Sequence, residues 1–183
     1  MFFYFRTSIR KFVRMEYKIK SCGKKDLEGI RSIINEEIAH SFSIYTDELH
    51  TPQYMEEWFD GRSRSNFPVF GLFDADGTLG GFASYGPFRN GSGYAATAEH
   101  SIYVRPDFRG KGLGALLLRT VMEHAKEKGI HVLVAGIDSK NVKSIALHRK
   151  MGFSYCGTIR EVGYKFGTWL DLVFYQFIFE NGL

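Results

Sequence analysis

The spacing of hydrophobic residues in the first third of the chain predicts two helices. Apolar residues recur at helical spacing after Asp26, which can cap a helix running to about Ala39: Leu27, Ile30, Ile33, Ile34 and Ile38. Thr51 and Pro52 have the residue types that favour the cap and the first position of a second helix. A short strand at residues 16–20 precedes both.

The rest of the chain alternates between strand and helix patterns. "VFGLFD" and "LGGFASYG" predict a hairpin closed by Asp76-Gly77, and 94–104 reads as a long strand. A helix from Leu113 to Lys128 separates that strand from the buried strand "HVLVAGI" at 131–137, which implies parallel pairing through a right-handed crossover. A last helix at 142–150 precedes two strands between 153 and 179, with a break near Gly163.

This order predicts an α/β (α+β) fold, in which a mixed, mostly antiparallel sheet carries helices on both faces. The chain has 183 residues, 44% of them hydrophobic, which fits one domain over 15–183. No apolar run approaches the roughly 20 residues that span a bilayer, so we expect no membrane span in this domain.

Charge and cysteine content narrow the function classes. Residues 1–14 hold four basic residues and no acid, so the remainder has 24 − 4 = 20 basic residues against 20 acidic ones. A neutral body argues against a general nucleic-acid surface. Cys22 and Cys156 match no disulfide or metal spacing, which favours free thiols and a cytoplasmic location. The six histidines form no ligand-like pair, so we expect no metal.

The first 14 residues, "MFFYFRTSIRKFVR", have two open interpretations. On a helical wheel the basic residues take one side and Phe2, Phe5, Ile9, Phe12 and Val13 share the other, which is typical of a membrane-surface or targeting segment. Alternatively Met15 is the native start, because "MEYKIKSCGKKDLEGI" reads like an ordinary opening strand and helix.

The turn "RGKGLG", Arg109 to Gly114, has the composition of an anion site. Its glycines allow backbone N–H groups to approach a bulky ligand, the following helix contributes the positive end of its dipole, and Arg109 and Lys111 add charge. Together these groups would hold a pyrophosphate. The alternative is a glycine-rich turn that only lets the helix pack closely.

A second motif lies downstream, in "NVKSIALHRKMGF" from Asn141 to Phe153. Asn141 and Ser144 would share one side of the helix start, with His148 one turn further on. A structural interpretation explains Asn141 as a helix cap, but it does not explain why this segment occurs together with "RGKGLG".

Four segments in order resemble the GNAT superfamily of N-acetyltransferases. They are "YGPF…GYAATAEHSIYV", "SIYVRPDFRGKGLG", "NVKSIALHRKMGF" and the ending "VGYKFGTWLDL". The match is similar in particular to the phosphinothricin acetyltransferase-like branch, which includes amino-acid N-acyltransferases. It extends from Met15 to about Phe179.

The resemblance implies a sheet splayed between the strand that ends near Val104 and the strand at 131–137, with acetyl-CoA in the splay. Its pantetheine arm would pair like an added strand, and its pyrophosphate would lie on the glycine turn. The implied cofactor-binding residues are Ile102, Tyr103, Val104, Arg109, Gly110, Lys111, Gly112, Leu113, Gly114, Ala115, Asn141, Ser144 and Lys150.

The resemblance also implies the catalytic groups. An amine must lose a proton to attack a thioester, and Glu99 corresponds to the glutamate proposed as that base, acting directly or through a water. His148 occupies a position where many relatives have a tyrosine or histidine, and it would protonate the leaving thiolate.

The acceptor is expected to be a small amine with a nearby acid, such as an amino acid or phosphinothricin. Phe42, Arg89 and Tyr94 are the candidate acceptor-binding residues. Other acceptors, namely a polyamine, an aminoglycoside or a protein N-terminus, and a non-catalytic acyl-CoA-binding module are the alternatives. The resemblance further implies a homodimer.

Overall fold

The computed structural model describes residues 16–180, and within them the strands form one sheet in the order β1-β2-β3-β4-β5-β7-β6. Neighbouring strands pair antiparallel except β4 and β5, which are parallel. The strands are β1 (Lys18–Ser21), β2 (Val69–Phe73), β3 (Leu79–Pro87), β4 (Thr97–Val104), β5 (Val132–Asp138), β6 (Ser154–Lys165) and β7 (Thr168–Ile178). The expected mixed, mostly antiparallel sheet is confirmed.

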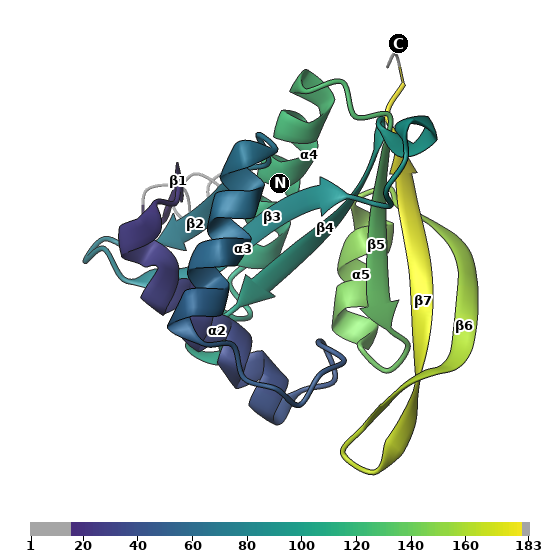
Figure 1. The fold of residues 1–183 in the computed structure, drawn as a ribbon, viewed down its shortest axis with the longest axis horizontal. Coiled ribbons are helices and arrows are strands. Elements are labelled where there is room, and N and C mark those ends of the chain that lie inside the picture. Colours follow the sequence, from purple (N-terminus) through teal and green to yellow (C-terminus); the bar gives the residue numbers. More distant parts are fainter. Residues whose placement is uncertain (1–15, 181–183) are drawn as a thin grey trace, which may run out of the picture.

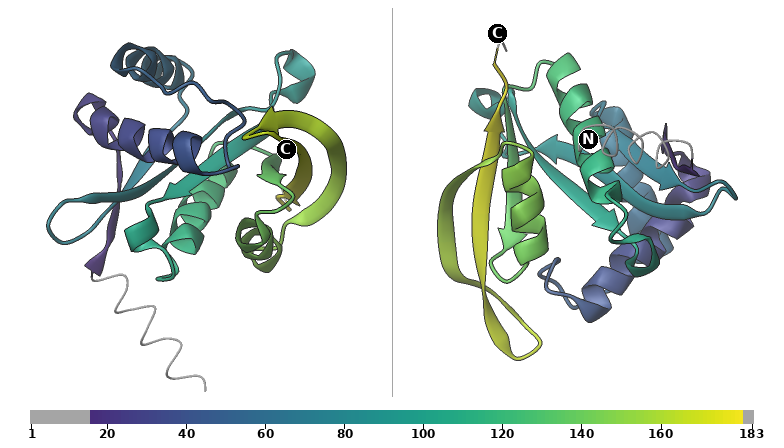
Figure 2. Two further views of the ribbon diagram at one scale, coloured as in Figure 1. Left: turned by 90° about the horizontal axis from the view of Figure 1, so that it is seen from below. Right: turned by 180° about the vertical axis from the view of Figure 1, so that it is seen from behind.

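Helices cover both faces of this sheet (Figure 1, Figure 2). On one face lie α2 (Leu27–His40) and α3 (Pro52–Arg64), and on the other α4 (Leu113–Glu127) and α5 (Val142–Lys150). Each face has its own core. Ile30, Ile38 and Phe82 are buried in the first, and Leu117, Val121 and Leu133 in the second. The apolar stripes seen in the sequence therefore face the sheet.

The two parallel strands separate soon after they meet. Their pairing covers only Thr97–Glu99 of β4 and Val132–Val134 of β5. Beyond Glu99 the strands diverge, and Figure 1 shows α5 beside β5 at the open end. This confirms the predicted splay and places Glu99 at its apex.

Most predicted bounds agree with the structure to within two residues, but two expectations were wrong. The strand expected at 94–104 begins only at Thr97, because Ser92–Tyr94 form a short 3-10 turn, η2. The last two strands meet at Phe166 and Gly167, not near Gly163. Both turn residues have positive φ, 48° and 74°, as a two-residue hairpin turn requires.

Gly163 instead lies inside β6, where close packing explains it. A Cβ there would come within 2.5 Å of the Tyr45 ring. The glycine thus makes room for a side chain from the segment that follows α2.

No helix in the described part of the chain is long and apolar enough to cross a membrane. The two interpretations of residues 1–14 concern a segment outside the described residues.

Candidate active site

The glycine-rich turn leads directly into the first turn of α4. Gly110 and Gly112 have φ of 80° and 79°, and Gly112 caps the helix in the left-handed conformation. A Cβ at either position would have no heavy atom within 4 Å, so the turn faces open space. The unpaired N–H groups at the start of a helix point into that space, as an anion site requires.

The two cations of the turn have partners within the protein. The Arg109 Nε–H donates to the Val104 carbonyl at 2.8 Å, and its guanidinium forms an ion pair with the buried Glu37 of α2. The Lys111 ammonium donates to the Tyr17 hydroxyl at 3.1 Å and lies over the Tyr17 and Phe108 rings. Both side chains therefore brace the turn, and the backbone and the helix dipole face the open side.

Helix α5 passes next to this turn. A Cβ at Gly114 would contact Leu147 at 3.4 Å, so the first turn of α4 approaches the middle of α5. Asn141 caps α5, with its Oδ1 accepting from the Ser144 N–H at 3.1 Å. Lys150 ends α5, roughly 12 Å along the axis from Val142, and its side chain is exposed. Asn141 and Ser144 thus lie at the start of α5, and Lys150 at its other end.

The end of β4 offers backbone on one edge. Ile102, Tyr103 and Val104 pair with β3 on one side, whereas the pairing with β5 has already ended at Glu99. An extended ligand could therefore add to this edge as a strand does.

Glu99 lies between two glycines on neighbouring strands. Gly86 of β3 is its register partner, and a Cβ on Gly136 of β5 would lie 2.9 Å from the Glu99 Oε1. Residues that oppose each other in an antiparallel pair share a face, so the Glu99 side chain is on the face covered by α2 and α3. Burial raises the pKa of the Glu99 carboxyl above its usual range. A raised pKa makes this carboxylate a stronger base than an exposed glutamate.

His148 forms a buried pair with His100 of β4. The His100 Nδ1 is 2.8 Å from the Val134 carbonyl, so it carries a proton and its Nε2 is an acceptor. The two Nε2 atoms are 3.0 Å apart, so a hydrogen bond between them would need a proton on the His148 Nε2. Burial lowers the pKa of both rings, that of His100 to about 3.

The other ring nitrogen of His148 faces its own helix. Its Nδ1 is 3.4 Å from the Ser144 Oγ and 2.8 Å from the Ser144 carbonyl. At 2.8 Å from a carbonyl the His148 Nδ1 is placed to donate, as the His100 Nδ1 is. A further proton between the two Nε2 atoms would make one ring an imidazolium, which burial disfavours.

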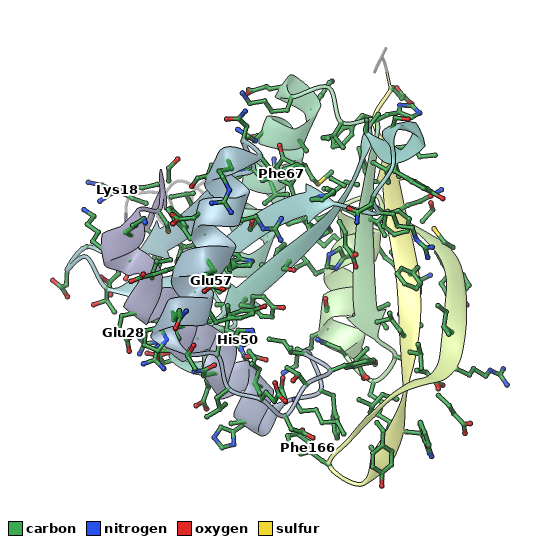
Figure 3. All side chains as sticks on the ribbon, viewed as in Figure 1. Lys18, Glu28, His50, Glu57, Phe67 and Phe166 are labelled. Atoms are coloured by element: carbon green, nitrogen blue, oxygen red, sulfur yellow. The ribbon has the colours of Figure 1, made fainter. Side chains whose placement is uncertain are left out.

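The three candidate acceptor-binding residues divide into two groups. Phe42 packs on Phe166 at a centroid distance of 5.5 Å and has the Lys140 ammonium over its ring, so it lies where β5 ends and the β6–β7 hairpin turns. Figure 3 shows Phe166 at the hairpin tip. Arg89 and Tyr94 are exposed in the loop before β4, where both contact the Phe88 ring. The fold does not bring them to Phe42.

The sequence did not predict the hydrogen bonds that fix the segment after α2, residues 41–45, to the sheet; we call these contacts the clamp. Lys165, 1% exposed, donates to the carbonyls of Ser41 and Ile44, both at 2.8 Å. The Tyr45 hydroxyl donates to Asp138 Oδ2 at 2.7 Å. No local pattern predicts contacts across more than 90 residues. The sequence signal is limited to Asp138, an aspartate in an otherwise apolar strand, whereas Lys165 follows other polar residues in its strand.

The comparisons with known proteins agree with this geometry. The model of the acetyltransferase (GNAT) family matches residues 31–153. An L-methionine sulfoximine/L-methionine sulfone acetyltransferase of Pseudomonas paraeruginosa is 44% identical over 162 residues, covering 88% of this chain and 94% of that protein. An L-amino acid N-acyltransferase of Escherichia coli is 39% identical over 158 residues, covering 86% and 91%.

A solved structure has the same fold. The phosphinothricin acetyltransferase of Sinorhizobium meliloti, in complex with acetyl-CoA, superimposes with a TM-score of 0.86 at 30% identity, covering 89% of this chain and 88% of that one. The chain belongs to the acetyltransferase (GNAT) family. It is an N-acetyltransferase that uses acetyl-CoA, and the resemblance to the phosphinothricin acetyltransferase-like branch is confirmed.

The described residues fit this cosubstrate. The open glycine turn at the start of α4 suits a pyrophosphate, and the unpaired edge of β4 suits an extended amide-bearing arm. Among the described residues no group of three or more His, Cys, Asp or Glu side chains forms a potential metal site.

Proposed function

We propose that this enzyme acetylates the α-amine of an amino acid or an amino-acid analogue, such as methionine sulfone, methionine sulfoximine or phosphinothricin. The observation that carries the proposal is the position of Glu99: a partly buried carboxylate with a raised pKa at the apex of the splay, one strand position from the free edge of β4. The names of three related acetyltransferases support the acceptor class.

The residues have distinct roles in this proposal. Acetyl-CoA supplies the activated acetyl group as a thioester. N–H groups from Gly110 to Ala115 hold its pyrophosphate, with Arg109 and Lys111 fixing the shape of the turn. The backbone of Ile102, Tyr103 and Val104 pairs with the pantetheine arm, and Asn141, Ser144, Leu113 and Lys150 complete the contacts.

The proton transfers involve Glu99 and His148. Glu99 accepts the proton that the acceptor amine must lose, directly or through a water. The His148 Nε2 lies 3.0 Å from the His100 Nε2. To protonate the departing thiolate, His148 has to hold a proton on Nε2 and turn it from His100 to the sulfur. Phe42 covers the open end of the site, and Arg89 and Tyr94 meet the acceptor from the loop before β4.

We further propose that residues 15–183 form one cytoplasmic domain that assembles as a homodimer. Support for the dimer comes from the edge strand β6 and its neighbour β7, which expose large apolar side chains: Tyr155, Ile159, Val162, Tyr164 and Trp169. Such a cluster on an unpaired edge strand is typical of an interface.

Free-thiol release from acetyl-CoA tests the acceptor class. The panel contains methionine sulfone, methionine sulfoximine, phosphinothricin, the standard amino acids, spermidine, an aminoglycoside and a peptide with a free N-terminus. Turnover should be highest on an amino acid or analogue. Preference for spermidine, the aminoglycoside or the peptide would replace the proposed acceptor. Acetyl-CoA binding without turnover on any amine would favour a non-catalytic binding module.

A further inference from the structure

Arg62 of α3 lies against the sheet beside the proposed base. Its Nη1 donates to the Tyr85 carbonyl at 2.6 Å, and its guanidinium lies 5.6 Å from the Trp58 ring centroid. A Cβ on Gly86 would be 1.7 Å from the Arg62 Nη1 and 2.7 Å from its Cζ. The guanidinium therefore occupies the space that Gly86 leaves free, and Gly86 is the register partner of Glu99.

The charge of this guanidinium has no counter-ion in the described part of the chain. The ion pairs found within residues 16–180 do not include Arg62, although its side chain is only partly exposed and burial lowers its pKa. A desolvated cation without a carboxylate is costly. Its Nη1 is used by Tyr85, so Nε and Nη2 are the donors that a ligand would meet.

The arrangement of the two charged groups suits a small zwitterion. Arg62 lies over β3 at Gly86, and the Glu99 carboxylate leans toward Gly136 of β5, so both groups are on the same face of the sheet at the apex of the splay. A ligand there would have a cation at one side and a carboxylate at the other. An α-amino acid carries the complementary pair, a carboxylate and an amine, on one carbon.

We propose that Arg62 binds the α-carboxylate of the acceptor while Glu99 faces its amine. This inference rests on the proposed function and adds the residue that selects acceptors bearing an acid next to the amine. Arg62 thus acts in specificity and does not transfer a proton. Gly86 is part of the same carboxylate-binding site, because any side chain there would displace the guanidinium.

The test compares acceptors that differ only in the carboxylate. Methionine sulfone, its primary amide and its decarboxylated amine are assayed with the wild-type enzyme, Arg62→Met, Arg62→Lys and Gly86→Ala. Arg64→Met is the matched control, since Arg64 is exposed on the same helix. We expect Arg62→Met to raise KM for methionine sulfone about 10- to 100-fold, as for the loss of a charged hydrogen bond. The KM for the amide and for acetyl-CoA should change less than about 3-fold.

The variants separate recognition from folding. Gly86→Ala keeps the arginine but moves its guanidinium, so it should also raise KM for the acid and not for the amide. Arg62→Lys keeps the charge but not the planar set of N–H donors, so its KM for methionine sulfone should fall between those of wild type and Arg62→Met. If Arg62→Met does not fold, the test is the comparison of wild type with Gly86→Ala on methionine sulfone and on its amide.

Failure of the Arg62 proposal and failure of the proposed function would give different results. Equal loss on acid and amide in Arg62→Met and Gly86→Ala, or full retention on both, would overturn the role of Arg62 while leaving an amino-acid acetyltransferase. A wild-type enzyme that acetylates none of the amino acids would overturn the proposed function itself.

Discussion

Glu99 combines the chemistry of a base with the cost of a partly buried charge. Gly86 and Gly136 flank it on β3 and β5, so neither neighbouring strand places a side chain beside it on that face. The carboxylate is exposed to a ligand entering the splay but is removed from most of the solvent, which raises its pKa. The partial burial that makes the Glu99 carboxylate more basic should therefore also reduce the folding stability of the protein when this group is ionised.

The substitution Glu99→Gln should stabilise the fold as the pH rises. A carboxyl whose pKa is raised by folding binds more protons in the native than in the unfolded state between its two pKa values. Wild type thus loses stability as the pH rises from the unfolded-state value of about 4.3 through the raised folded value, whereas the amide does not. Chemical denaturation of both proteins from pH 4 to pH 8 measures this difference. Glu56→Gln, an exposed change on α3, should show no such trend.

His148 allows a smaller but separate prediction at this scale. If a proton on the His148 Nε2 serves the thiolate, His148→Asn should reduce kcat about 10-fold, less than the loss at Glu99. Steady-state kinetics at saturating acetyl-CoA would show it. An unchanged kcat would mean that the thiolate leaves without assistance.

The glycine turn and the start of α4 act together as one element. Gly110 and Gly112 adopt positive φ, which costs roughly 1–2 kcal/mol for a residue with a Cβ. Gly110→Ala or Gly112→Ala should therefore weaken acetyl-CoA binding about 10-fold by distorting the turn, with little effect on acceptor KM. Isothermal titration with acetyl-CoA tests this. Gly93→Ala, a glycine without positive φ and with open space around it, is the matched control.

The β6–β7 hairpin holds the segment that follows α2 through Lys165. Replacing this residue by Met leaves the Ser41 and Ile44 carbonyls without a charged donor, so we expect a loss of about 2 kcal/mol in unfolding free energy. Hydrogen exchange at residues 41–46 should become faster because the clamp is released. Arg160→Met, on the exposed part of β6, should leave that exchange unchanged.

At the scale of the whole molecule, the exposed aromatic residues of the β6–β7 hairpin predict self-association. Tyr164 and Trp169 are 59% and 58% exposed and contact each other at 5.0 Å between ring centroids. Light scattering should give about twice the 20.9 kDa chain mass, and Trp169→Glu should lower it. Tyr54→Glu, on α3, should not. A monomeric wild-type protein would contradict the proposed dimer.

The order of elements was predictable because hydrophobic spacing is a local property. Leu113–Glu127 and Val142–Lys150 agree with the expected helices almost to the residue. The misplaced break at Gly163 has a non-local cause, since its glycine is required by Tyr45, 118 residues earlier. A phenylalanine with positive φ at the true turn gives no sequence signal.

The candidate site was predicted unevenly for the same reason. The glycine turn, Glu99 and Asn141 form local motifs, so the sequence shows them directly. Arg62 and His100 acquire their significance only through sheet register and helix packing, which bring Gly86 to Glu99 and His148 to His100. The partners of Arg109 and Lys111 were equally invisible, and their formal charge suggested a freer role than their contacts support.

The most direct measurement of the central claim is the turnover of Glu99→Gln beside wild type on the best amino-acid acceptor. We predict that kcat falls about 10²- to 10⁴-fold while the acetyl-CoA dissociation constant stays within about 2-fold. Equal turnover in the two proteins would remove Glu99 from the proton transfer and contradict the mechanism.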